Sequence, residues 1–180
     1  ISASGRTDAG THAKGQVVNF HCNSNMSCEE ILSQLRRYLP EDIGIESVRN
    51  VSERFHARLH AKTKTYRYRV WNSSAPCVFD RKYVSMDLRH LDISRMKMAA
   101  QDFLGTHDFS AFCGNKNMKK STVRTIFSFS IEQIGNEVVF TVTGNGFLQH
   151  MVRIMVGTLL EIGAGERAED SIPALFGGKR

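Results

Sequence analysis

"STVRTIFSFSIEQIGNEVVFTVTGN", residues 121–145, is the stretch that decides the class of the fold. Val, Ile, Phe and Thr fill both of its halves, a composition typical of strands. Gly135 and Asn136 separate the halves, and such a pair between two strand-like runs indicates a β-hairpin. We therefore expect an antiparallel hairpin within the sheet of this protein.

Helices are predicted on both sides of the hairpin. Residues 147–162 are apolar almost all round, so this helix should be buried, with Asn145 as its N-cap. Asp92 should cap a second helix that ends at Gly105. Hairpins mixed with helices predict an α+β fold, with a mainly antiparallel sheet and helices packed on one face.

A third helix and two short strands are predicted in the first 51 residues. Ser27 and Glu30 have the spacing of a capping box, and the helix that they start must stop near Pro40. Residues 14–22 and 43–51 read as strands. We expect one catalytic region over residues 1–180, shortened at both ends relative to a longer protein, with two lobes at 1–50 and 51–180.

Composition restricts the class of protein and its partners. The 180 residues carry a net charge of +6, which indicates either an anionic partner such as nucleic acid or merely a basic protein. The four cysteines form no C-x-x-C pair and no zinc-like cluster, so we expect no metal and a reducing cytoplasm. No apolar run approaches the roughly 18 residues of a membrane span.

Asp8 lies in the glycine-bounded loop "SGRTDAGTHAKGQVVNF", residues 4–20. Arg6 and His12 supply nearby positive charge, which favours the ionised carboxylate. Such an aspartate can act as a nucleophile or general base, or it can simply bond backbone amides in a turn. No second carboxylate lies near it in sequence, so a metal site is a poor interpretation.

Residues 55–71 alternate with period two, which predicts one long strand. One face is apolar, and the other is basic and aromatic: His56, Arg58, His60, Lys62, Lys64, Tyr66 and Tyr68. Cations neutralise phosphates and tyrosine rings stack on bases, so this face indicates RNA binding. The alternative is a solvated outer face of the sheet.

Arg153 is the only charged side chain between Phe147 and Leu160 of the apolar helix, with histidine counted as neutral. A buried guanidinium needs an anionic partner, for which Asp8 is a candidate. Alternatively, Arg153 reaches solvent or pairs with another acid such as Glu161.

The ordered motifs of the chain resemble those of the TruA-type tRNA pseudouridine synthases. The matching segments are "GRTDAGTHAKGQVVNF" (5–20), "FHAR" (55–58), "KTYRY" (64–68), "GTHDFSAF" (105–112) and "NGFLQHMVRIMVG" (145–157). Thr11 stands where the family usually has Val. The resemblance implies a pseudouridine synthase fold, a homodimer and no cofactor.

The resemblance also implies roles for individual residues. Asp8 matches the catalytic aspartate, Tyr66 the tyrosine that stacks on the flipped uracil, and Arg153 the arginine that pairs with the aspartate. Arg6 matches the arginine that enters the RNA. We expect RNA contacts from five cations: Arg6, His12, Arg58, Lys62 and Lys64.

The implied reaction converts uridine to pseudouridine in the tRNA anticodon arm, at tRNA positions 38–40, after base flipping. Asp8 would attack either C1′ of the sugar or C6 of the base. The competing hypotheses are a non-catalytic RNA-binding module and a glycosidase. The last requires two carboxylates about 5 to 9.5 Å apart.

Overall fold

The computed structural model describes residues 1–115 and 117–178. The chain divides into two compact units, a first unit of Ile1–Ala61 and a second unit of Lys62–Arg180. The first unit therefore extends to Ala61, and the prediction of lobes at 1–50 and 51–180 stays a prediction.

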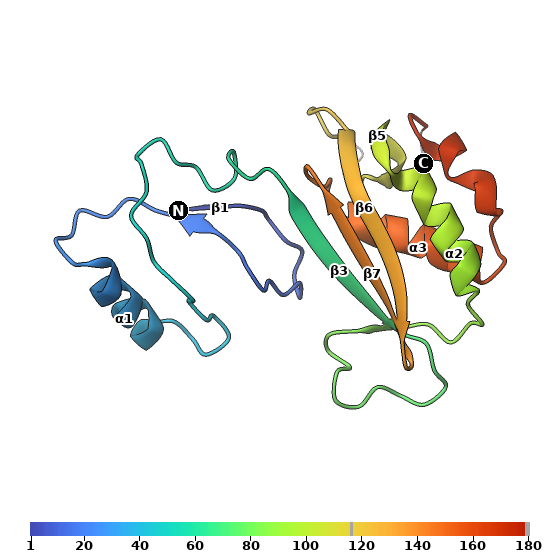
Figure 1. Ribbon diagram of the computed structural model, residues 1–180, viewed down its shortest axis with the longest axis horizontal. Coiled ribbons are helices and arrows are strands. Elements are labelled where there is room, and N and C mark those ends of the chain that lie inside the picture. Colours follow the sequence, from blue (N-terminus) through green and yellow to red (C-terminus); the bar gives the residue numbers. More distant parts are fainter. Residues whose placement is uncertain (116, 179–180) are drawn as a thin grey trace. The chain divides into compact units, whose positions relative to one another are not determined.

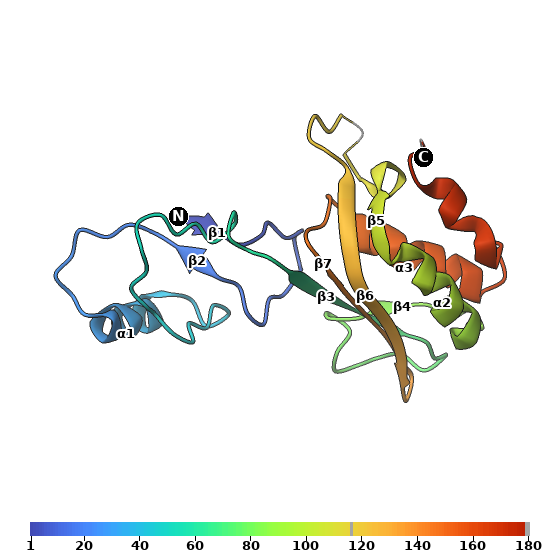
Figure 2. The same cartoon turned by 45° about the horizontal axis from the view of Figure 1, so that its top comes forward.

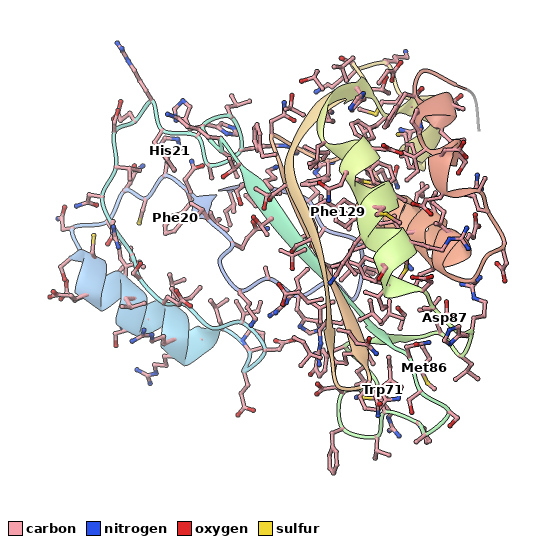
Figure 3. All side chains as sticks on the ribbon, turned by 45° about the vertical axis from the view of Figure 1, so that its right-hand side comes forward. Phe20, His21, Trp71, Met86, Asp87 and Phe129 are labelled. Atoms are coloured by element: carbon pink, nitrogen blue, oxygen red, sulfur yellow. The ribbon has the colours of Figure 1, made fainter. Side chains whose placement is uncertain are left out.

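A five-stranded sheet forms the framework of the second unit (Figure 1). Its strand order is β4-β3-β7-β6-β5, and only the β3–β4 pair is parallel. The strands are β3 (Lys64–Trp71), β4 (Ser85–Met86), β5 (Gly105–Asp108), β6 (Val123–Ile134) and β7 (Glu137–Gly144). Figure 3 shows Trp71 of β3 beside Met86 and Asp87, as the β3–β4 register requires.

The predicted hairpin is confirmed. Ile134 of β6 pairs with Glu137 of β7, so Gly135 and Asn136 alone form the turn, with Gly135 at φ 58°. A shift in register between Ile126 and Ser128 marks an irregularity in β6. Phe127, which lies at that irregularity, is 52% exposed.

Two helices, α2 (Ile93–Ala100) and α3 (Met151–Gly163), cover one face of the sheet (Figure 2). The Asp92 cap is confirmed, because its side chain accepts a hydrogen bond from Arg95 N. A 3₁₀ turn, Gln101–Phe103, continues α2. Further 3₁₀ turns lie at Ser110–Phe112, Glu169–Ser171 and Pro173–Leu175. The predicted α+β class is confirmed.

The core lies between these helices and the sheet. Alternate residues of β7, namely Val138, Phe140 and Val142, are fully buried. Phe103, Phe109 and Phe112 pack against one another with ring centroids 5.3 to 6.4 Å apart. The core also contains these residues of α2 and α3: Met96, Ala99, Met155, Val156, Leu159 and Ile162.

Helix α3 begins later than its sequence predicts. The side chain of Asn145 does not cap the helix, because its Oδ1 accepts a hydrogen bond from Thr125 N of β6 at 3.0 Å. The helix begins at Met151, preceded by His150 in the left-handed region at φ 59°. Among the described non-glycine residues, His150 alone has a positive φ. A tertiary hydrogen bond has therefore replaced the local cap.

The prediction of one strand over residues 55–71 is wrong for residues 55–63. His56 Nδ1 accepts hydrogen bonds from Arg58 N and Leu59 N, which folds this segment into turns. Within β3, the tyrosines pair with Val142 and Phe140 and pack against the core, while Arg67 is exposed. A single basic, aromatic face along these residues therefore does not form.

The first unit consists of β1 (Ser2–Ala3), β2 (Val18–Asn19) and α1 (Cys28–Tyr38). The capping box is confirmed in both directions: Glu30 N donates to Ser27 Oγ, and Ser27 N donates to Glu30 Oε2. Leu39 follows α1 as its C-cap, so the predicted stop near Pro40 is also confirmed.

Of the two strands predicted in the first unit, one is shorter than expected and the other does not form. Only Val18–Asn19 forms a strand within 14–22, and residues 43–51 form none. Arg36 of α1 donates instead to the carbonyl oxygens of Ile45 and Glu46, at 3.0 and 3.2 Å. Of the residues in this unit, all of which the structure describes, only Ala57 is buried.

Candidate active site

The loop that carries Asp8 connects β1 to β2 and is closed at its neck by hydrogen bonds. Ser4 N donates to Val17 O at 2.8 Å, and Gln16 Nε2 donates to Gly5 O at 3.0 Å. Ser4 Oγ also donates to Gln16 Oε1. The short β1–β2 pair and these hydrogen bonds therefore hold the two ends of the loop next to each other.

Within this loop, Asp8 begins a tight turn. Thr11 N donates to the backbone carbonyl of Asp8 at 3.1 Å, and Gly10 has a φ of 79°, which glycine adopts without strain. Asp8 is partly exposed, whereas Arg6 and His12 are exposed. In sequence, the turn thus lies between Arg6 and His12, two residues with exposed side chains.

The strand that follows the loop is anchored to the "FHAR" segment, residues 55–58. Asn19 Oδ1 of β2 accepts a hydrogen bond from Ala57 N at 2.9 Å. Ala57 is buried and Arg58 beside it is exposed. Two motifs that lie almost 40 residues apart in sequence are thus joined in the first unit.

In the second unit, Tyr66 of β3 contacts Phe147 of the turn before α3. Their ring centroids are 5.0 Å apart with an interplanar angle of 79°, an edge-to-face pair. Lys64, at the start of the same strand, is partly exposed, and Lys62 is exposed. The ring of Tyr66, which sequence predicts as a site residue, therefore packs against the ring of Phe147.

Close packing at Gly144 supports this aromatic pair. A Cβ at Gly144 would lie 2.7 Å from Thr125 O and 3.3 Å from Phe147 Cζ. Because the nearer contact is to backbone, no other residue fits here without a shift of β6. Gly144 thus lets the turn of residues 145–150 approach β6 and place Phe147 against Tyr66.

Arg153 of α3 is exposed, which favours the alternative in which its guanidinium reaches solvent. The neighbours Met151, Val152, Met155 and Val156 are buried, whereas Gln149 and Arg153 lie on the uncovered side. Glu161, the alternative partner, accepts a hydrogen bond from Arg167 Nε at 2.7 Å. A helix that is apolar on most sides still leaves one stripe open, and Arg153 belongs to that stripe.

The predicted site residues divide between the two units. Arg6, Asp8, His12 and Arg58 belong to the first unit, and Lys62, Lys64, Tyr66 and Arg153 to the second. The pairing of Asp8 with Arg153 has one member in each unit and stays a prediction.

Sequence reasoning does not identify Phe147, the aromatic partner of Tyr66, or Gly144, which packs against Phe147. The sequence predicts Phe147 in a buried helix, although the residue lies in a turn before α3. The signal that favours a turn is the pair of glycines in "GNGF", residues 144–147.

The described residues include no cluster of three or more His, Cys, Asp or Glu side chains that could hold a metal ion. The four cysteines are free thiols. None of the helices in the described ranges has the length and apolar character to cross a bilayer.

Comparison with known proteins gives a consistent result. A family described as tRNA pseudouridine synthase matches residues 99–180. The tRNA pseudouridine synthase A of Bacillus sp. strain KSM-64 is 44% identical over 179 residues, which cover 99% of this chain and 73% of the relative.

Two further relatives agree. The tRNA pseudouridine synthase A of Halalkalibacterium halodurans is 45% identical, over 98% of this chain and 67% of the relative. A protein of Bacillus anthracis named tRNA pseudouridine synthase A 2 is 42% identical, over 97% of this chain and 71% of the relative. With this identity along almost its whole length, the chain belongs to the tRNA pseudouridine synthase A family.

Proposed function

We propose that this protein isomerises uridine to pseudouridine in the anticodon arm of tRNA, with Asp8 as the nucleophile. Membership of the family makes it an isomerase that acts on tRNA uridines. The choice of anticodon-arm uridines and the role of Asp8 are the finer parts of the proposal. The observation that supports the role of Asp8 is its turn in a loop whose neck is closed by β1 and β2. The choice of anticodon-arm uridines rests on the family resemblance alone.

The reaction breaks two bonds and forms two, without oxidation or reduction. The bond between N1 of uracil and C1′ of ribose breaks, the detached base turns, and C5 bonds to C1′. The proton leaves C5 and N1 gains one, so atoms and electrons balance. If Asp8 attacks C1′, it displaces N1 and is in turn displaced by C5; if it adds to C6, it is expelled from the base after C5 has bonded to C1′.

The surroundings of Asp8 suit a nucleotide that leaves the base stack. Arg6 and His12 are exposed on the same loop, and Arg58 lies on the segment anchored to β2. Cations at these positions neutralise the phosphates that flank the extruded uridine. Lys62 and Lys64 add positive charge at the start of β3.

Tyr66 supplies the aromatic partner for the base in this proposal. A base that leaves its stack loses its neighbours, and contact with a tyrosine ring replaces part of that interaction. The edge-to-face contact with Phe147 limits the orientations of the phenol ring. Arg153 balances the charge of the Asp8 carboxylate, and its position on the uncovered stripe of α3 leaves the guanidinium accessible.

We further propose that the protein works as a homodimer in the cytoplasm, with one tRNA contacting both subunits. Four free thiols are compatible with a reducing compartment. Light scattering of the protein with and without tRNA tests the assembly, and a monomer at all concentrations would contradict it.

The competing function is a non-catalytic RNA-binding module, which would use the same cations. Asp8→Asn distinguishes the two, since it removes the nucleophile and keeps the size of the side chain. We expect loss of pseudouridine formation in a tRNA transcript, with tRNA affinity within about twofold of wild type. Asp42→Asn, at an exposed position of the same unit, is the matched control. Undiminished turnover by Asp8→Asn would refute the assignment.

A further inference from the structure

Arg124 of β6 differs from the other partly buried arginines of the second unit. Four of them pair with carboxylates: Arg69 with Glu137 and Asp80, Arg89 with Asp87 and Glu166, Arg95 with Glu169, and Arg167 with Glu161. Arg124 is also partly buried, yet among the described residues no carboxylate pairs with it. Within the described part of the chain, no carboxylate therefore compensates its charge.

The hydrogen bonds of Arg124 use only one end of its guanidinium. Nη1 donates to Ser121 O at 2.9 Å and to Val123 O at 2.6 Å, both neutral acceptors. These bonds fix the plane of the group, and the described residues accept nothing from Nε or Nη2. Burial lowers the pKa of Arg124, which reflects the cost of holding this charge away from water.

The position of Arg124 relates it to the aromatic pair. Its Nε lies 3.7 Å from the place where a Cβ on Gly146 would be, and its Cδ lies at 3.8 Å. Gly146 immediately precedes Phe147, whose ring contacts Tyr66. The next residue of β6, Thr125, holds the same turn through Asn145. Arg124 thus lies against the turn that places Phe147 on Tyr66.

A guanidinium with two adjacent unused donors is suited to a phosphate group. Nε–H and Nη2–H point in parallel and match two oxygens of a phosphate in a bidentate contact. An uncompensated charge that is partly desolvated gains more from such a contact than a fully solvated lysine does. RNA supplies a phosphate on each side of any nucleotide that turns out of its stack.

We propose that Arg124 binds a backbone phosphate of the RNA next to the uridine that contacts Tyr66. This inference rests on the proposed function, because it takes tRNA as the ligand. Arg124 acts as a binding residue that fixes the position of the RNA backbone, and it takes no part in bond making.

The test measures the affinity of a tRNA transcript as a function of KCl concentration, for wild type, Arg124→Gln and Arg124→Lys. Arg124→Gln should weaken binding at least about tenfold, the value of a charge-assisted hydrogen bond. The slope of log K against log salt should fall in magnitude by about 1. Arg124→Lys should keep the slope but lose several-fold in affinity, because an ammonium cannot make the bidentate contact.

Arg95→Gln is the matched control, since it removes an equal charge from a partly buried arginine whose partner is Glu169. It should leave the slope unchanged. An unchanged slope for Arg124→Gln, or an equal change for Arg95→Gln, overturns the proposal. If Arg124→Gln fails to fold, wild-type affinity of Arg124→Lys overturns it. Absence of pseudouridine formation by the wild type refutes the proposed function, whereas the phosphate contact is decided by the binding data.

Discussion

The ring of Phe147 meets the ring of Tyr66 edge to face, with centroids 5.0 Å apart. One ring comes from a turn and the other from β3, so the contact connects two elements that are distant in sequence. This contact limits the orientations that the phenol ring of Tyr66 can adopt. Phe147 is therefore a positioning residue for Tyr66.

Phe147→Leu should reduce kcat for pseudouridine formation about five- to tenfold, in line with the roughly 0.5–1.5 kcal/mol of an aromatic pair. Leucine retains an apolar side chain but removes the edge contact, so affinity for tRNA should change little. Single-turnover assays and tRNA titrations measure the two effects. Phe127→Leu, at the exposed irregularity of β6, should match the wild type. Equal kcat values for both variants would contradict the positioning role.

Arg153→Met should lower activity by at least about 100-fold, the scale of removing one electrostatic contact at a reacting group. The fold should persist, because Arg153 is exposed and methionine is a good helix former. Thermal unfolding and the tRNA modification assay test the two statements. Arg81→Met, at another exposed arginine of the second unit, is the control. Activity within twofold of wild type would exclude Arg153 as the partner of Asp8.

Gly144→Ala should destabilise the second unit by about 1–3 kcal/mol, as other overpacked sites do. The added Cβ would lie 2.7 Å from Thr125 O, so β6 or β7 must move. Gly157→Ala is the control within α3, where a Cβ meets nothing within 4 Å. It should stabilise by about 0.5–1 kcal/mol, because alanine favours helix. Urea unfolding compares the two, and equal stabilities would contradict the packing argument.

Asp108 should make the stability of the second unit depend on pH in acid. The hydroxyl of Thr122, which donates to Asp108 Oδ1, lowers the pKa of that carboxyl, and Ser110 N donates to the same oxygen. A folded pKa below the ordinary value means that this stabilisation is present above about pH 4 and is lost as pH falls through the folded pKa.

Asp108→Asn should flatten this acid dependence, because the amide does not titrate. Urea midpoints between pH 6 and pH 2.5 measure the effect. Asp102→Asn, at a partly exposed position of the same unit, is the comparison and should retain the wild-type profile. An unaltered profile for Asp108→Asn would show that this carboxyl does not contribute.

The elements that sequence predicts correctly are those with local causes. The capping box at Ser27, the cap at Asp92 and the turn at Gly135 each depend on atoms within a few residues. The local sequence also predicts Asn145 as a helix cap, but the side chain of Asn145 accepts a hydrogen bond from Thr125 N of β6 instead. A hydrogen bond between distant segments is invisible in the order of residues.

The same distinction explains the candidate site. The glycines around Asp8 and the tyrosine at position 66 are visible as motifs, whereas the contact of Phe147 with Tyr66 exists only after β3 and β7 pair. The alternation of side chains with period two over residues 55–63 predicts a strand. Instead, the imidazole of His56 accepts hydrogen bonds from backbone N–H groups, and the segment folds into turns. The exposure of Arg153 depends on which stripe of α3 the sheet leaves open.

The first unit has a single buried side chain, Ala57, and holds its loop through hydrogen bonds at exposed positions. Cooperative melting depends on buried apolar contacts, and these lie almost entirely in the second unit. A calorimetric transition of this chain therefore reports the unfolding of the sheet and its helices. It does not report the order of the segment that carries Asp8. Amide exchange at Ser4 and Thr11 is the observable that follows the order of that segment.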